Sequence, residues 1–165
     1  MSASLPRLIG INHVALEVGD IDKALAFYGK IFRFTLRGRG KGQAFIDMGD
    51  QFLALMETSS AHDLVRKPDS TFRDHARAPH QDGGRHFGLA VDDRARVREL
   101  AQAAGAKMVD GPFLDFLDPW GNRIEVVPYA DIQFSKAPHV LRGMQFDGLK
   151  SDKARKELAD KNMAL

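Results

Sequence analysis

Two histidines occupy the same position in a stretch of sequence that occurs twice. His13 opens the stretch His-Val-Ala-Leu-Glu-Val-Gly-Asp, and His86 opens His-Phe-Gly-Leu-Ala-Val-Asp-Asp, so both fit the pattern H-x-x-L-x-V-x-D. A carboxylate residue, Glu125, lies in a later apolar segment. Two imidazoles and one carboxylate can hold a divalent metal while leaving coordination positions open for water or substrate. We therefore predict a divalent metal site, with iron, manganese, nickel and zinc as candidate ions.

The elements that carry these residues follow from the spacing of apolar positions. Each copy of the repeat alternates apolar and other residues, which is typical of a strand. An amphipathic helix is predicted after each copy, over 21–31 and 95–104. Asp20 or Asp22 is a candidate N-cap of the first helix, and Gly105 is a candidate C-cap of the second. Three short strands are predicted after each helix: 34–38, 43–48 and 51–57 in the first half, and 107–110, 113–117 and 122–128 in the second. The predicted fold class is α+β, with two βαβββ modules.

Strand parity places the three candidate ligands on one kind of surface. Leu16 and its apolar neighbours must face the helix, so His13 points away from it. The same alternation turns His86 and Glu125 away from the second helix. Three strands therefore each contribute one metal-competent residue to the side of a sheet that the helix leaves uncovered.

Other residues share these surfaces. Ala15 and Ala54 fall on the side of His13, and Arg123 falls on the corresponding side of the second sheet, so we expect the three to line a substrate pocket. Glu17 also shares the side of His13 and is a candidate general base. The histidines of the segment 58–84 are further candidates for a general base, and the residues by themselves do not choose between them.

The composition narrows the function classes. The chain has 165 residues and a mass of 18.3 kDa, with 44% hydrophobic and 28% charged residues, as in ordinary globular domains. It has no cysteine, which excludes disulfides, thiolate metal sites and cysteine nucleophiles. The 24 basic and 22 acidic residues are scattered, so no nucleic-acid partner is expected. No apolar run is long enough for a membrane span or a signal peptide, so we expect a soluble, cytoplasmic protein.

The chain is expected to form one domain over residues 1–165. We divide it into module one at 8–57, a linker at 58–84, module two at 85–129 and a C-terminal extension at 130–165. The linker is polar and carries three histidines and two prolines, so we predict a long loop, with a short helix around 60–65, that borders the pocket mouth as a lid. The charge-dense segment 151–161 predicts an exposed helix, and Trp120, in the turn 118–121, is expected to be partly exposed.

Three segments resemble motifs of the vicinal oxygen chelate superfamily. They are Asn12-His-Val-Ala-Leu-Glu-Val18, Arg85-His-Phe-Gly-Leu-Ala-Val91 and Asp118-Pro-Trp-Gly-Asn-Arg-Ile-Glu125. This superfamily includes glyoxalase I, extradiol dioxygenases, and fosfomycin- and bleomycin-resistance proteins, and the resemblance covers about residues 8–129. It implies a curled mixed β-sheet cup and assigns His13, His86 and Glu125 as metal ligands. It also implies a homodimer whose modules complete the cup.

The resemblance leaves the reaction open. A three-ligand site implies an oxidoreductase of the dioxygenase type, or a related metal-assisted enzyme, acting on a small oxygenated substrate. A glyoxalase I-like lyase or isomerase is an alternative, but Ala54 stands where that enzyme has a fourth ligand and cannot coordinate. A metal-free, bleomycin-resistance-like binding protein is the other alternative. Ala15 and Asp115 replace a threonine and a tyrosine of the fosfomycin-resistance proteins, so this chain departs from that group as well.

Overall fold

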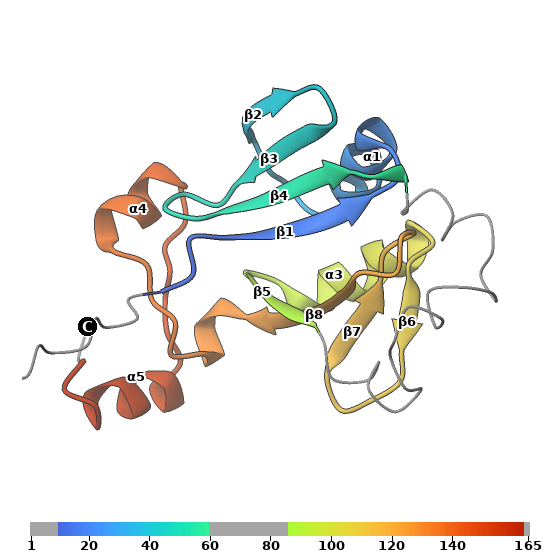
Figure 1. Ribbon diagram of the computed structural model, residues 1–165. Coiled ribbons are helices and arrows are strands. Elements are labelled where there is room, and N and C mark those ends of the chain that lie inside the picture. Colours follow the sequence, from blue (N-terminus) through green and yellow to red (C-terminus); the bar gives the residue numbers. More distant parts are fainter. Residues whose placement is uncertain (1–9, 60–85, 164–165) are drawn as a thin grey trace, which may run out of the picture.

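Two four-stranded sheets form the frame of the protein. The computed structural model describes residues 10–59 and 86–163, and its two sheets lie one above the other in Figure 1. Each sheet belongs to one βαβββ module, which confirms the predicted α+β fold class. The first module comprises β1 (His13–Val18), α1 (Ile21–Ile31), β2 (Leu36–Gly40), β3 (Gln43–Asp47) and β4 (Phe52–Glu57). The second comprises β5 (Phe87–Val91), α3 (Arg94–Ala103), β6 (Lys107–Val109), β7 (Leu114–Leu117) and β8 (Arg123–Pro128).

The strand order is the same in both sheets. It runs β1-β4-β3-β2 in the first and β5-β8-β7-β6 in the second. In each sheet the first strand of the module pairs in parallel with the last, and the other neighbours are antiparallel. Within the described chain, β1 and β5 are therefore edge strands, and such edges can pair with another chain.

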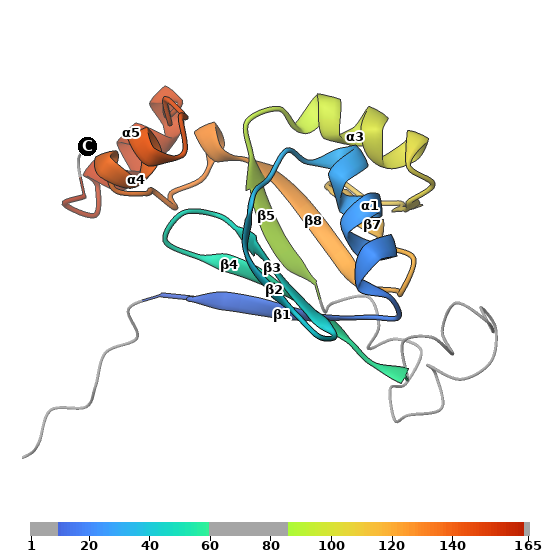
Figure 2. The ribbon, with the colours of Figure 1, turned by 90° about the horizontal axis from the view of Figure 1, so that it is seen from above.

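An aspartate begins each of the two module helices. The side chain of Asp20 accepts a hydrogen bond from the backbone N–H of Lys23, and that of Asp93 accepts one from Arg96, both at 2.9 Å. These bonds satisfy backbone donors that the first helical turn leaves free. The two helices then lie side by side, as Figure 2 shows.

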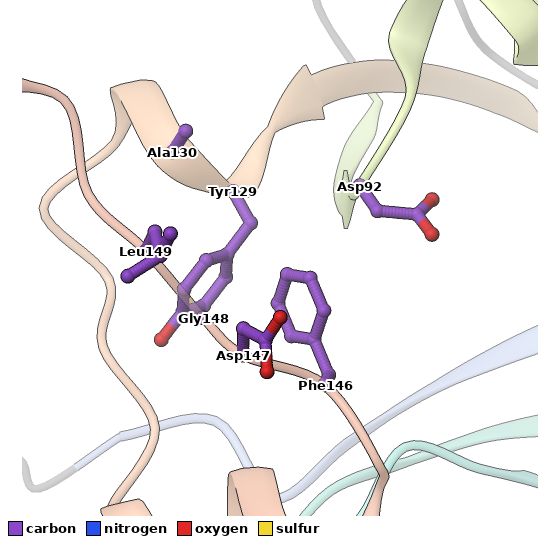
Figure 3. Close-up of a pocket in the computed structure, with 7 residues that line it drawn as sticks. All are labelled: Asp92, Tyr129, Ala130, Phe146, Asp147, Gly148 and Leu149. Carbon is purple, nitrogen blue, oxygen red and sulfur yellow. The ribbon is translucent and has the colours of Figure 1, made fainter.

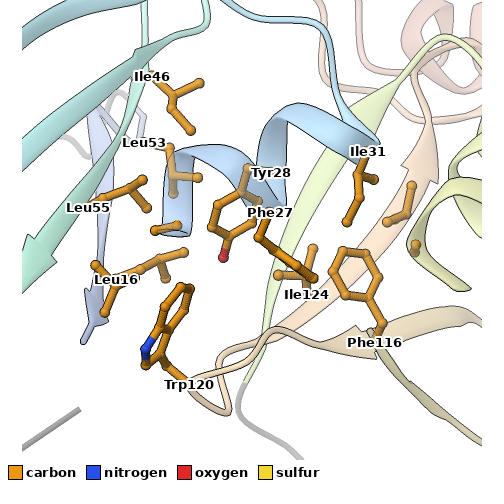
Figure 4. Close-up of a cluster of buried hydrophobic side chains, with 14 of the residues drawn as sticks. Leu16, Phe27, Tyr28, Ile31, Ile46, Leu53, Leu55, Phe116, Trp120 and Ile124 are labelled. Atoms are coloured by element: carbon orange, nitrogen blue, oxygen red, sulfur yellow. The ribbon is translucent and has the colours of Figure 1, made fainter. Parts of the chain in front are cut away.

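One buried cluster joins both modules. Figure 4 shows Phe27 of α1 beside Phe116 and Ile124 of the second sheet, with Leu53 and Leu55 of β4 approaching the helix from the first sheet. Burying a side chain of this size contributes about 1.5–3 kcal/mol. The helix-facing sides of both sheets therefore share one core, and the opposite side of each sheet is left to the predicted site residues.

A polar contact lies inside this core. The hydroxyl of Tyr28 in α1 donates a hydrogen bond of 2.8 Å to Asp118 in the turn between β7 and β8. Burial raises the pKa of Asp118 even though it accepts further bonds from Trp120 and Asn122. Burial, and secondarily the charge of Asp118, raises the pKa of Tyr28 well above its ordinary value. The pair ties the first module to the turn that precedes β8.

The turn also holds Trp120, and here the prediction of a partly exposed side chain is wrong. Trp120 is only 5% exposed and packs in the shared core. The turn pattern gave no sign of this burial, because a turn after a strand is usually a surface feature. The backbone N–H of Trp120 donates to Asp118, which turns the indole inward with the rest of the turn.

The residues after β8 connect the two modules a second time. They form a 3-10 turn (Tyr129–Asp131), α4 (Pro138–Gly143) and α5 (Asp152–Ala159), and the predicted C-terminal helix is therefore present at α5. Lys136 forms an ion pair with Asp50 in the turn between β3 and β4. The ammonium of Lys150 donates to the backbone carbonyls of Tyr129, Ile132 and Phe134. None of the helices in the part of the chain that the structure describes is both long and apolar enough to cross a bilayer.

Candidate metal centre

His13 is the first residue of β1 and lies on the uncovered side of its sheet. Its ring stacks on that of Phe52, its cross-strand partner on β4, with centroids 4.6 Å apart and planes 11° apart. Its Nδ1 lies 2.9 Å from the side-chain carbonyl oxygen of Asn12. A carbonyl oxygen only accepts, so Nδ1 carries the proton and Nε2 keeps the lone pair that a metal needs.

A positively charged side chain, that of Arg37, contacts the phenyl ring of Phe52. The guanidinium carbon of Arg37 is 5.0 Å from the centroid of Phe52. Arg37 is the extra residue of a β-bulge, because Leu36 pairs with Ile46 whereas Gly38 pairs with Phe45. The bulge breaks the regular alternation of side chains along β2, which is how bulges redirect a residue.

His86 and Glu125 meet on the second sheet. His86 Nε2 lies 2.7 Å from Glu125 Oε2, and their side chains are 35% and 18% exposed. Glu125 pairs with Gly88 on β5, so the strand register places the carboxylate beside the residue that follows His86 by two. Two ligands at adjacent corners of an octahedron, each about 2.1 Å from a metal, are about 3.0 Å apart. The observed spacing is close to that value.

The described chain does not bring the three predicted ligands together. Within residues 10–59 and 86–163, no group of three histidine, aspartate or glutamate side chains converges on a point that could hold a metal ion. His13 belongs to the first sheet and the His86–Glu125 pair to the second, and the two sheets share their helix-facing sides. In one protomer, His13 therefore lies apart from the His86–Glu125 pair.

A buried carboxylate lies next to the His86–Glu125 pair. Asp115 on β7 is the cross-strand partner of Glu125 and is only 4% exposed. One of its oxygens accepts from Nε of Arg123 at 2.8 Å, and a second nitrogen of the same guanidinium also contacts it. Its other oxygen, Oδ1, is buried without a hydrogen-bond partner among the residues described. Arg123, predicted to line the pocket, is therefore held against Asp115.

The other predicted pocket residues lie on the face of His13. Ala15 pairs with Ala54 in the strand register, and Ala15 is exposed whereas Ala54 is 3% exposed. Glu17 is exposed on the same face, four residues beyond His13, which corresponds to about 13 Å along a strand. Glu17 therefore lies away from any group that His13 binds directly.

A pocket of about 250 Å³ opens elsewhere, near the C-terminal segment. Figure 3 shows its lining, which consists of Asp92 directly after β5 on one side and Tyr129, Ala130 and residues 146–149 on the other. No predicted site residue lines this pocket. The lid and short helix predicted within the linker lie outside the described residues from position 60 onward.

Sequence reasoning missed two parts of this surface. Asn12 precedes His13 directly, yet alternation along a strand gives no indication that a neighbouring side chain will fold back onto the ring. The contact of Arg37 with Phe52 was not predicted, because the bulge at Arg37 has no signature in the sequence beyond the glycines of β2. The sequence shows that Asp115 replaces a tyrosine of the fosfomycin-resistance proteins. Only the structure shows that Asp115 is buried and contacts Arg123.

Comparison with known proteins agrees with the fold. The sequence profile of the Glyoxalase/Bleomycin resistance protein/Dioxygenase superfamily matches residues 10–126. A curated relative, glutathione transferase FosA from Serratia marcescens, is 25% identical over 124 residues, which cover 72% of this chain and 80% of that protein.

Solved structures show the same arrangement of modules. A variant of the genomically encoded fosfomycin resistance protein FosX from Listeria monocytogenes, complexed with Mn(II) and a dihydroxypropylphosphonic acid, matches with a TM-score of 0.53 and 17% identity, covering 84% of this chain and 99% of that one. An integron cassette protein from Vibrio cholerae matches with a TM-score of 0.52 and 21% identity, covering 76% and 99% of the two chains.

Proposed function

Because the chain belongs to the glyoxalase/bleomycin resistance/dioxygenase superfamily, we propose that it is a divalent-metal-dependent enzyme acting on a small oxygenated substrate. Its metal ligands are His86 and Glu125 of one protomer together with His13 of a second. The observation that carries the proposal is the 2.7 Å approach of His86 Nε2 to Glu125 Oε2 on the uncovered side of the second sheet. The manganese in the FosX complex supports a divalent ion of this type.

The donor atoms present fit such an ion. Two neutral imidazoles and one carboxylate suit iron, manganese, nickel or zinc and leave open positions. His86 would bind a metal as the neutral imidazole and Glu125 as the carboxylate. Asn12 fixes the His13 tautomer that has a free Nε2, as outer residues commonly do for ligating histidines.

A second protomer supplies what one protomer lacks. His13 lies on the edge strand β1 of one sheet, and His86 directly precedes the edge strand β5 of the other. A two-fold dimer that brings β1 of one protomer against β5 of the other would cover both edges and would form two equivalent sites. This is why the proposal includes a homodimer.

The bound metal would act as a Lewis acid that stabilises negative charge on a chelated substrate oxygen. The chain's own residues hold the ligands in place, exclude water through the apolar residues around them, and orient the substrate. Ring-cleaving dioxygenation is the first reaction to test, and glyoxalase I-like lyase or isomerase chemistry is the alternative. A site with three protein ligands, rather than the four of glyoxalase I, favours ring-cleaving dioxygenation.

The experiment mixes two inactive variants. His13→Ala and Glu125→Gln each remove one ligand, and each variant alone should lose metal, as measured by elemental analysis after dialysis. After subunit exchange, a mixed dimer has one site with both substitutions and one intact site, so about a quarter of all sites should bind metal again. A site built within one chain predicts no recovery, because every chain then lacks a ligand.

Two controls make the result specific. Glu99→Gln changes an exposed residue of α3 that pairs with Arg96, so its metal content should equal that of the wild type. The reaction is then screened by oxygen uptake with catechols and by turnover of the methylglyoxal–glutathione hemithioacetal. A wild-type dimer that holds no metal would refute the proposal and favour a metal-free binding protein.

A further inference from the structure

Arg37 differs from the other charged residues of its strand because a bulge determines where it lies. The register of β2 against β3 skips one residue between Leu36 and Gly38, and Arg37 is that residue. Its guanidinium reaches over the ring of Phe52, which belongs to the face that carries His13. Bulges are frequent next to binding sites, where they redirect a side chain.

The rings beneath the guanidinium form a continuous platform. The ring of Phe45 meets Phe52 edge-on at 5.7 Å, and Phe52 stacks on His13 at 4.6 Å. The strand order places Phe52 between His13 on β1 and Arg37 on β2, with its ring 4.6 Å from the His13 ring and 5.0 Å from the guanidinium carbon. His13 and Arg37 therefore both contact the same ring.

The charge of Arg37 is not neutralised by the residues around it. Arg39, two positions further along the strand, forms an ion pair of 2.8 Å with Asp22. Arg37 forms no ion pair with any residue that the structure describes. The nearest carboxylate on this face by register is Asp47, opposite Phe52, and it accepts a hydrogen bond from the backbone N–H of Gly49.

Physical chemistry then indicates what Arg37 can bind. A guanidinium has five N–H donors and no acceptor, and it matches the oxygens of a carboxylate or a phosphate in a bidentate manner. A guanidinium that lies over an aromatic ring can keep its N–H donors available for an anion. The contact with Phe52 also reduces the freedom of a long side chain, so less entropy is lost when an anion binds.

We propose that Arg37 binds an anionic group of the substrate, a carboxylate, phosphonate or phosphate, at a fixed distance from the oxygens that chelate the metal at His13. This assignment rests on the proposed function and specifies its substrate class: a small chelating molecule with an anionic tail. Arg37 is then a substrate-binding residue that determines specificity.

The test uses two probes that differ only in the tail. Both 3,4-dihydroxyphenylacetate and 4-methylcatechol chelate a metal through the same two oxygens, but only the first has a carboxylate. Their dissociation constants for Mn²⁺-loaded protein are measured by calorimetry under nitrogen, which prevents oxidation of the catechols. The variants are Arg37→Gln and the matched control Arg39→Gln.

The wild type should bind the carboxylate probe about 10- to 100-fold more tightly than 4-methylcatechol, the gain expected for hydrogen bonds between charged groups. Arg37→Gln should abolish the preference, and Arg39→Gln should keep it. High salt should weaken it, because the contact is between partly exposed charges. The assignment is overturned if the wild type shows no preference, or if Arg37→Gln retains it.

A second measurement separates this assignment from the metal proposal. Inorganic phosphate titrated into metal-free protein should shift the NMR signal of the Arg37 Nε–H and leave that of Arg39 unchanged. Absence of metal in the wild type refutes the proposed function, whereas an Arg37 signal insensitive to phosphate refutes the anion site, whatever the metal content.

Discussion

Replacing Tyr28 with phenylalanine removes a hydroxyl that joins the two modules inside their shared core. The hydroxyl donates to Asp118 at 2.8 Å, and the two residues are only 1% and 5% exposed. Asp118 also accepts a hydrogen bond from the backbone N–H of Asn122 and so stabilises the loop before β8, the strand that carries Glu125. The substitution keeps the ring and its packing, so its effect isolates the hydrogen bond.

The expected decrease in the free energy of unfolding follows from the kind of hydrogen bond that is lost. A hydrogen bond to a charged group contributes about 1.5–3 kcal/mol, compared with about 0.5–1.5 kcal/mol for a neutral pair. For a chain of this size, that loss corresponds to a fall in Tm of about 3–12 °C. Tyr129→Phe is a matched control, because the Tyr129 hydroxyl accepts a bond from the backbone N–H of Lys136 and loses only a neutral partner.

The dependence on pH has a definite sign. Burial raises the pKa of Tyr28 well above its ordinary value, so the folded protein keeps this proton at a pH where the unfolded chain loses it. The contribution of Tyr28 to the free energy of unfolding is complete below about pH 10 and is lost as the pH rises above it. The free energies of unfolding of the wild type and of Tyr28→Phe should therefore become more similar above pH 10.

Urea unfolding followed by far-ultraviolet circular dichroism measures the free energy of unfolding of the wild type, Tyr28→Phe and Tyr129→Phe. The reasoning is refuted if Tyr28→Phe costs less than about 0.5 kcal/mol, or no more than Tyr129→Phe. It is also refuted if the gap to the wild type stays constant between pH 8 and pH 11. A double-mutant cycle with Asp118→Asn would show whether the lost energy belongs to this pair.

Three further predictions concern other contacts. Gly49→Ala should lower the free energy of unfolding by about 1–2 kcal/mol and speed proteolysis near α4, because φ is +85° at this glycine and a Cβ would lie 2.8 Å from the sulfur of Met144. Lys150→Met should cost at least about 2 kcal/mol and increase hydrogen exchange over 131–163, since three backbone carbonyls lose a charged donor. Asn12→Ala should weaken Mn²⁺ binding about 10- to 100-fold, measured by calorimetry, while unfolding changes by less than about 0.5 kcal/mol, because it frees the His13 ring at the surface.

The fold was predictable because local patterns and long-range packing agree. The alternation in the first repeat buries Leu16 and Val18 and leaves His13 exposed, and Asp20 caps the first helix as one of the two predicted candidates. Trp120 was mispredicted because its environment is made by the other module, which a local turn pattern does not encode.

The candidate site was predictable only in part. Parity placed His86 and Glu125 on the same face, and the structure brings them to 2.7 Å. The alternation of side chains along a strand does not predict whether His13 lies near His86 and Glu125. That proximity depends on how the two sheets are arranged relative to each other. The position of Arg37 depends on a bulge, which shifts a side chain without changing the apolar pattern.

The parallel pairing of β5 with β8 has a consequence for the order of folding. These are the first and last strands of the second module, and α3, β6 and β7 lie between them in the sequence. His86 and Glu125 can therefore come together only after that whole stretch of chain has been synthesised. Contacts between residues distant in sequence form slowly, because the loop between them must be closed first. A chain still on the ribosome thus has no contact between His86 and Glu125 until β8 has emerged, and a chain that stops before β8 never acquires one.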